Sequence, residues 1–193
     1  MYYRNCIVGL QGSGKTQLAK KMAREFITKR QKVLIIDLMK EYNLKGADIY
    51  RPVDNVNPVE EVSTVIQNYI INPFEETGNQ PYRLVIFDES SRYFNNKLSL
   101  PKPMGYINDF ARHLKINVIT VARRFTQINT DLVELSHNLY IFNQSGLNDI
   151  KRLDELSIGL GDTVLNLKPY HYVYVNQTRQ YEIKNPINIK VNR

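Results

Sequence analysis

A glycine-rich segment near the start of the chain has the residue types and spacing of a phosphate-binding loop. Residues 9–16 read GLQGSGKT and match G-x-x-x-x-G-K-[ST] at every fixed position, which makes a glycine turn without a ligand the weaker alternative. The glycines let the backbone curl, so that successive N–H groups and the start of the following helix point at phosphate oxygens. Lys15 is expected to project into a solvated loop and reach the β- and γ-phosphates, and the Thr16 hydroxyl to bind Mg²⁺. The residues expected to contact the nucleotide are Gly9, Gly12, Ser13, Gly14, Lys15, Thr16 and Gln17.

A pair of adjacent carboxylates supplies the second half of the predicted site. Asp88 and Glu89 directly follow the apolar run 84–87, which reads LVIF and predicts a buried strand. A carboxylate at the tip of such a strand lies where open α/β folds bind ligands, so Asp88 is expected to hold Mg²⁺ and Glu89 to orient the attacking water. Hydrolysis needs a base beside the metal ligand, whereas a kinase uses the hydroxyl of its substrate. The pair therefore favours a hydrolase. The alternative is that the two acids are polar residues at the end of a strand without a catalytic role.

These residues need a sheet to position them, and the rest of the sequence predicts one. Strand and helix patterns alternate, which is typical of a mainly parallel sheet flanked by helices. Apolar runs predict strands at 4–8, 33–36, 84–87, 116–122 and 139–142. Helical spacing of apolar residues predicts helices from 15 to about 30, from 57 to 71, through 110 and 114, and around 150–156. The phosphate loop and Asp88 both follow strands, so we expect them at the same edge of the sheet.

Some boundaries rest on capping residues and turn composition. Asn57 is the expected N-cap and Pro58 the first residue of the second helix, which is expected to end before Asn72. The polar stretch 75–81 predicts a surface loop. Three short strands, the last two forming a hairpin, are expected at 164–167, 172–175 and 180–183. We expect a single domain over residues 1–193, with a core at about 4–156 and C-terminal strands at about 160–193.

Composition excludes several classes of protein. The chain has 193 residues and is 42% hydrophobic, which excludes intrinsic disorder. A single cysteine, Cys6, excludes a disulfide-stapled scaffold, and the three histidines show no spacing typical of a metal site. No apolar run is long enough to cross a membrane, and no signal peptide is expected before the first strand. The net charge of +7 suits a polyanionic partner without requiring one.

Several segments beyond the phosphate loop resemble the FtsK and HerA superfamily of P-loop ATPases, motors that move double-stranded DNA through a ring. Residues 33–42 read VLIIDLMKEY and resemble the D-x-x-x-E-Y of HerA-like proteins. Residues 110–122 read FARHLKINVITVA and are similar to the arginine-bearing helix that runs into the fourth strand of the family. Residues 123–132, RRFTQINTDL, resemble the segment that follows, where the family carries a polar sensor, often glutamine.

This resemblance adds three arginines to Lys15 and Glu89 as catalytic candidates. Arg112 is expected to be supplied to the γ-phosphate of a neighbouring subunit, with Arg123 and Arg124 as secondary candidates. The alternative for Arg112 is an ion pair with Asp109. Arg124 stands at the aligned position of the sensor.

The resemblance also implies a fold and partners. It implies a RecA-like P-loop NTPase, ATP and Mg²⁺ as cofactors, double-stranded DNA as partner and a homo-oligomeric ring, a pentamer or hexamer. No N-terminal barrel domain, membrane segment or separate DNA-reading domain is expected from this sequence. Such minimal chains are most similar to the genome-packaging ATPases of tailless icosahedral DNA viruses. The expected role is thus to package a viral genome into a preformed capsid, with capsid or portal-vertex proteins as partners, in the cytoplasm of a host cell or associated with the virion.

Two further classes share the first motif. A nucleoside or nucleotide kinase has a similar length but needs a lid of arginines, which residues 139–154 do not clearly supply. A phage assembly or export ATPase is the other alternative, although it normally carries a membrane anchor. A GTPase is disfavoured, because residues 143–146 read NQSG rather than the Asn-Lys-x-Asp that reads guanine.

Overall fold

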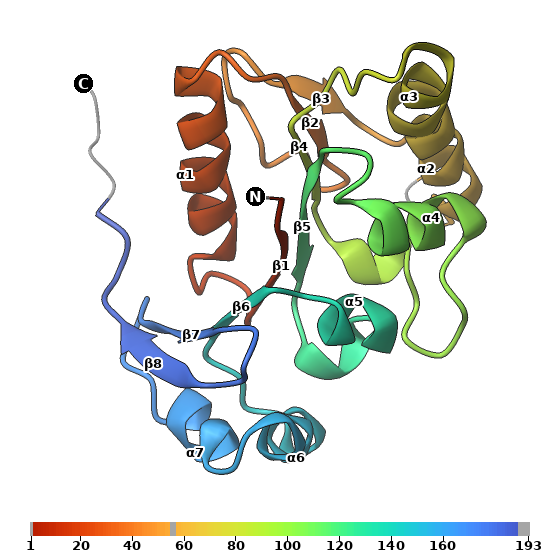
Figure 1. The fold of residues 1–193 in the computed structure, drawn as a ribbon. Coiled ribbons are helices and arrows are strands. Elements are labelled where there is room, and N and C mark those ends of the chain that lie inside the picture. Colours follow the sequence, from red (N-terminus) through yellow and green to blue (C-terminus); the bar gives the residue numbers. More distant parts are fainter. Residues whose placement is uncertain (1, 55–56, 189–193) are drawn as a thin grey trace.

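The computed structural model describes residues 2–54 and 57–188, and its strands form one eight-stranded sheet (Figure 1). The strands are β1 (Arg4–Val8), β2 (Val33–Ile36), β3 (Asp48–Tyr50), β4 (Leu84–Phe87), β5 (Asn117–Ala122), β6 (Asn138–Phe142), β7 (Tyr172–Val175) and β8 (Tyr181–Lys184). Their order across the sheet is β3-β2-β4-β5-β1-β6-β7-β8. The first six strands pair in parallel, and β7 and β8 are antiparallel. The predicted fold class is confirmed.

Helices cover both faces of this sheet. They are α1 (Lys15–Thr28), α2 (Val59–Ile66), the π-helical η1 (Gln67–Ile71), α3 (Asn72–Thr77), α4 (Lys102–Phe110), α5 (Thr130–Glu134), α6 (Leu147–Leu156) and α7 (Leu160–Leu165), with short 3₁₀ turns η2 (Ser90–Arg92) and η3 (Phe125–Gln127). Figure 1 shows α1 on one side of the sheet and α2 and α4 on the other. Ile7 of β1 packs in the cluster with Leu18 and Ala23 of α1, whereas its neighbours Cys6 and Val8 lie in the cluster on the opposite face. This alternation follows from the two-residue period of a strand.

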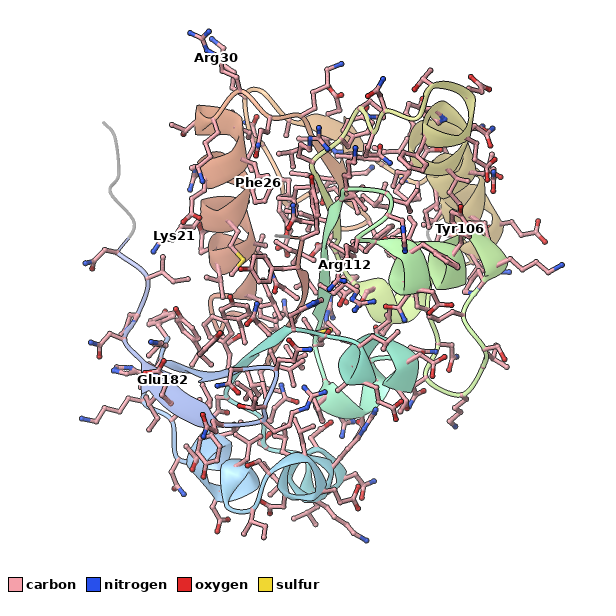
Figure 2. All side chains as sticks on the ribbon, in the orientation of Figure 1. Lys21, Phe26, Arg30, Tyr106, Arg112 and Glu182 are labelled. Carbon is pink, nitrogen blue, oxygen red and sulfur yellow. The ribbon has the colours of Figure 1, made fainter. Side chains whose placement is uncertain are left out.

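Helix α1 has the amphipathic pattern expected from its sequence. Phe26 packs against the cluster on its face of the sheet, whereas Lys21 and Arg30 are exposed. Figure 2 shows Phe26 on the sheet side of α1, Lys21 on the outer side and Arg30 beyond its C-terminal end. Lys21 and Arg24 of α1, and Lys29 and Arg30 just beyond it, are therefore exposed to solvent, as expected.

The helix predicted to end before Asn72 continues beyond it. Its N-cap is Pro58 rather than Asn57, so α2 begins one residue late. After Ile66 the chain widens into the π-helical turn η1 and then enters α3, which includes the start of the stretch predicted as a surface loop. Pro73 lies in the first turn of α3, where its missing N–H costs no regular hydrogen bond. The π-helical turn thus allows the helix to pass the proline.

The strand predicted at 164–167 is wrong, because residues 160–165 form helix α7. Gly159 adopts a left-handed φ of 79° at the start of this helix, a conformation that favours glycine. Leu160 and Val164 are both buried, and their spacing of four residues is helical. The predicted strands at 172–175 and 180–183 correspond to β7 and β8, which form the hairpin.

The segment between α4 and β5 continues the helix for one turn. The N–H of Leu114 donates to the carbonyl of Phe110 at 2.9 Å, and the N–H of Ile116 donates to the carbonyl of Ala111 at 3.1 Å. Lys115 has a left-handed φ of 53°. This is the Schellman arrangement that ends a helix. It places the exposed Arg112 on the last turn before β5 (Figure 2).

Candidate functional site

The carboxyl ends of the parallel strands open into a cavity of about 650 Å³. Five strands contribute, because the lining includes residues that follow β1, β2, β4 and β5 and the last residue of β6. The lining residues are Gln11, Gly12, Gly14, Lys15, Thr16, Gln17, Glu41, Asp88, Glu89, Arg123, Phe142, Tyr170, Pro186 and Ile187. The predicted phosphate loop and the predicted carboxylates therefore meet in one pocket, at the sheet edge where open α/β folds bind ligands.

The phosphate loop has the backbone that its glycines predict. Gly12 and Gly14 have φ angles of 75° and 109°, and the N–H groups of both have no acceptor among the described residues. Gly9 is required for a different reason, because a Cβ there would lie 2.5 Å from Cβ of Phe142. The hydroxyl of Ser13 is buried without a partner in the described part of the chain. Free N–H groups and an unsatisfied hydroxyl in one loop fit a phosphate ligand.

Lys15 lies deeper than expected. The sequence predicted a side chain projecting into a solvated loop, but Lys15 is only 7% exposed, and its Nζ donates to the carbonyl of Leu10 at 2.8 Å. Burial lowers the pKa of the Lys15 ammonium, and the nearby carboxylates of Glu89 and Asp88 oppose that shift. The ammonium is folded back over its own loop, where a phosphate could replace the carbonyl as its partner.

Glu41 belongs to the site, although it was not among the residues predicted from the sequence. Its Oε2 accepts a hydrogen bond of 2.8 Å from the hydroxyl of Thr16, and its side chain lines the cavity. Asp37 positions it, because the buried Asp37 carboxylate accepts hydrogen bonds from the N–H groups of Glu41 and Tyr42 at 2.9 and 3.0 Å. The D-x-x-x-E-Y pattern could have indicated Glu41, because its aspartate, Asp37, holds the turn that places Glu41 at the pocket.

The donor set at this end of the pocket fits Mg²⁺. The Thr16 hydroxyl and the Asp88 carboxylate both line the cavity, and hydroxyl, carboxylate and phosphate oxygens are the ligands that Mg²⁺ prefers. Within the described residues no group of three histidines, cysteines or acids is placed to hold a metal alone. A bound nucleotide would have to complete the coordination.

The carboxyl group of Asp88 has a raised pKa. Burial, and then the carboxylates of Glu89, Glu41 and Asp37, raise its pKa from 3.8 to about 7, while Lys15 opposes the shift. Without a cation, crowded buried carboxylates are costly to ionise. A divalent cation would remove that cost.

Asp88→Asn is therefore expected to stabilise the ligand-free protein at about pH 8 and not at about pH 4. The folded-state pKa of Asp88 exceeds its ordinary value, so folding stability is lost as the pH rises from about 4 through about 7. The asparagine cannot ionise and avoids that loss. Thermal unfolding at both pH values measures the difference, with Asp162→Asn, at an exposed position of α7, as control. An equal change in melting temperature at both pH values would contradict the assignment.

Glu89 lies beside Asp88 in a strained conformation. Its φ of 50° is left-handed, which is uncommon for a residue with a β-carbon and typical of functional sites. Oε1 of Glu89 accepts a hydrogen bond of 2.7 Å from Nε of Arg123, and this partner raises the pKa of Arg123. The carboxylate is thus fixed at the pocket by a residue that follows the neighbouring strand.

The two arginines after β5 lie in different surroundings. Arg123 lines the cavity, whereas Nε of Arg124 donates to Oδ2 of the buried Asp149 at 2.9 Å, outside the cavity. Asp149 also accepts hydrogen bonds from the N–H and hydroxyl of Thr126. The structure therefore places Arg123, not the predicted Arg124, in the pocket that Asp88 and Glu89 line.

Arg112 lies apart from this pocket. It lines a second cavity of about 200 Å³, together with Tyr2, Arg4, Asp109, Ala111, His113 and His137. Most of these residues lie near the amino ends of β1, β5 and β6, the sheet edge opposite the phosphate loop. Within the described part of the chain no ion pair joins Arg112 to Asp109. The structure does not bring Arg112 to the nucleotide pocket of its own chain.

A family model described as the central domain of helicase HerA matches residues 3–156. The chain belongs to the HerA family. The predicted resemblance is confirmed, and the P-loop ATPase fold with it. Among curated protein sequences none matches the chain.

Solved structures show where this HerA-family fold recurs. The genome-packaging NTPase B204 of Sulfolobus turreted icosahedral virus 2, in complex with ATPγS, has a TM-score of 0.79 at 16% identity, with 96% of this chain and 98% of that chain covered. B204 of Sulfolobus turreted icosahedral virus, described as a DNA-packaging ATPase, has a TM-score of 0.78 at 16% identity, covering 95% and 97%. VirB4 of Thermoanaerobacter pseudethanolicus has a TM-score of 0.72 at 10% identity, covering 97% and 90%. In the described residues no helix is long and apolar enough to span a membrane.

Proposed function

We propose that this HerA-family chain is an ATP-hydrolysing motor that translocates double-stranded DNA and packages a viral genome into a capsid. The observation that carries the proposal is Glu89, held beside Asp88 at the mouth of the phosphate pocket by Arg123 at 2.7 Å. A carboxylate next to the metal ligand is what hydrolysis requires. The similarity in fold to a viral genome-packaging NTPase favours DNA as the polymer that is moved.

In this proposal different residues of the pocket would bind the phosphates, bind the metal and orient the attacking water. The N–H groups of the loop and Lys15 would hold the β- and γ-phosphates. Thr16 and Asp88 would hold Mg²⁺, whose charge would offset the negative charge of the phosphates. Glu89 orients the attacking water. Glu41 accepts a hydrogen bond from the Thr16 hydroxyl, which would leave the lone pairs of the Thr16 oxygen free for the metal.

The kinase alternative has weaker support. A kinase needs several arginines that close on the phosphates, yet among the described residues the pocket is lined by a single arginine, Arg123, which is bound to Glu89. An export or assembly ATPase would use the same pocket, so DNA dependence must separate it from a DNA motor.

Turnover of ATP with and without double-stranded DNA tests the proposal. We expect stimulation by DNA, none by nucleosides, and DNA binding that is independent of sequence and falls steeply with salt, because a motor grips the phosphate backbone. Stimulation by a nucleoside would favour the kinase, and DNA-independent turnover the export or assembly class. A site preference that persists at high salt would point to a sequence-specific regulator.

We also propose that Arg112 acts on the nucleotide of a neighbouring subunit in a pentameric or hexameric ring. The second cavity is strongly cationic: Arg4 and Arg112 each lower the pKa of His137, after the effect of burial, and among the described residues Asp109 is the one acid that lines it. Nε of Arg4 is buried without a partner in the described structure. Two arginines face a single acid in this cavity, and the γ-phosphate of a neighbour would supply a further anion.

Mixing two inactive variants tests this role of Arg112. Glu89→Gln subunits cannot hydrolyse ATP but still offer Arg112, whereas Arg112→Ala subunits lack the arginine but keep Glu89. Mixed rings are expected to regain part of the turnover that neither variant has alone, since an arginine in trans is worth about 10³-fold or more. Lys21→Ala, on the outer side of α1, serves as the active control. Co-assembled rings without recovery, or full activity of Arg112→Ala alone, would remove Arg112 from this role.

The remaining assignments belong to the same proposal. We propose that residues 1–193 act as one ATPase domain in the host cytoplasm or with the virion, with capsid or portal-vertex proteins as partners. Arg124 stays a sensor candidate, and its pairing with Asp149 makes it the weaker one beside Arg123.

A further inference from the structure

The nucleotide pocket has two chemically different ends. One end carries charged and polar side chains, Lys15, Thr16, Asp88 and Glu89 among them. The other is walled by aromatic and aliphatic groups, Phe142, Tyr170, Pro186 and Ile187. Phe142 joins the ends, because a Cβ added to Gly14 of the phosphate loop would lie 3.3 Å from its Cε1. The apolar end is therefore continuous with the phosphate site.

Tyr170 is an unusual residue on this apolar wall. It lies in the turn between α7 and β7 with a left-handed φ of 63°, a conformation that is strained for a residue with a β-carbon. Its side chain lines the pocket although the residue is 61% exposed. Within the described residues no hydrogen bond or ring contact holds the Tyr170 ring. The strained backbone therefore places an aromatic ring at the pocket, and the described residues make no hydrogen bond or ring contact with it.

A second part of the apolar lining comes from the chain that follows β8. Pro186 and Ile187 line the pocket, and Ile187 also packs against the apolar cluster around α1. Figure 1 shows the chain after β8 running towards the end of α1 that follows the phosphate loop. Tyr170 and Ile187 both lie beyond residues 3–156, so the segment shared with the HerA family model contains neither of them.

We propose that Tyr170 and Ile187 form the subsite for the base of the bound nucleotide, which stacks on the tyrosine ring and packs against the isoleucine. The inference deepens the proposed ATPase function and rests on it. A triphosphate on the phosphate loop would occupy the charged end and leave its base at the apolar end. Among the four apolar-wall side chains the Tyr170 hydroxyl is the one hydrogen-bonding group, so stacking area rather than base edges would set the affinity. Purine triphosphates should therefore bind alike and more tightly than pyrimidine triphosphates.

Calorimetric titration of the full chain with Mg-ATP and with inorganic tripolyphosphate tests the subsite. Tyr170→Ala keeps a β-carbon on the strained backbone and removes only the ring, so we expect ATP affinity to fall roughly tenfold or more. Tripolyphosphate has no base, and its affinity should change less than about twofold. Tyr170→Phe should bind ATP as the parent does, and Ile187→Ala should weaken ATP but not tripolyphosphate. Tyr69→Ala, an exposed tyrosine on η1, is the matched control.

The possible results separate the subsite from the phosphate site. Unchanged ATP affinity in Tyr170→Ala, or an equal loss for ATP and tripolyphosphate, would overturn the base subsite while leaving the ATPase proposal intact. Failure of the parent chain to bind either ligand would instead overturn the proposed function, and the subsite with it. A selective loss of ATP affinity in both Tyr170→Ala and Ile187→Ala would establish the subsite.

Discussion

Lys15→Ala is expected to abolish ATP binding or turnover while the fold persists. The side chain supplies a positive charge over the predicted β- and γ-phosphate positions, and removing two charge-assisted hydrogen bonds together lowers affinity by about 10²-fold or more. In the ligand-free protein its Nζ donates to the carbonyl of Leu10, and burial already penalises its charge. Removing it should leave the melting temperature unchanged or slightly higher. ATP titration and thermal unfolding of the same preparation measure both effects.

The control for this variant is Lys21→Ala, which removes an exposed lysine from the outer side of the same helix (Figure 2). It should bind and hydrolyse ATP as the parent does. Parental turnover in Lys15→Ala would show that residues 9–16 do not act as a phosphate loop.

Glu89→Gln is expected to bind Mg-ATP normally and to hydrolyse it about 10²-fold or more slowly. The amide keeps the shape of the side chain but cannot take a proton from the attacking water. It also breaks the charged pair with Arg123, whose Nε lies 2.7 Å from the carboxylate. Because both groups are partly exposed to solvent, that loss should cost little stability. Single-turnover kinetics at saturating ATP separates the chemical step from binding.

A matched control is Glu76→Gln, an exposed glutamate on α3 on the far side of the molecule. Loss of ATP binding together with turnover in Glu89→Gln would reassign Glu89 to a structural or metal-binding role. Arg123→Ala provides a further comparison, since it frees the carboxylate without removing it, and a moderate loss of turnover would identify Arg123 as a positioning residue.

The parts of the fold that the sequence predicts well are those with strong local signals. Continuous apolar runs identified β2 and β4 because each strand is buried on both faces. The glycines within residues 9–14 indicated a tightly curled loop, and Gly12 and Gly14 have the positive φ angles that such a loop needs. The strand β3 was missed because three residues at a sheet edge carry no periodic pattern. Helix α7 was mistaken for a strand because it has only six residues. So few positions do not distinguish the helical spacing of apolar residues from the alternating spacing of a strand.

The predicted site was incomplete where its geometry depends on residues distant in sequence. Glu41 reaches Thr16 across 25 positions, and Arg123 reaches Glu89 across 34. The D-x-x-x-E-Y pattern marks the turn that carries Glu41 but not its contact with Thr16, and the contact of Arg123 with Glu89 leaves no local pattern. The choice between Arg123 and Arg124 is decided by Asp149, a buried acid on α6 that binds the second arginine and leaves the first for the pocket. Tyr170 was not predicted as a site residue, because a left-handed tyrosine cannot be recognised from the sequence.

The central claim, that ATP hydrolysis drives this chain along double-stranded DNA, is tested most directly by displacement of a third strand from a DNA triplex. The assembled protein should displace the third strand when Mg-ATP is present. It should not do so with a non-hydrolysable analogue, and Glu89→Gln rings should fail even at saturating ATP. Displacement that needs no hydrolysis, or hydrolysis stimulated by DNA that displaces nothing, would contradict a translocating motor.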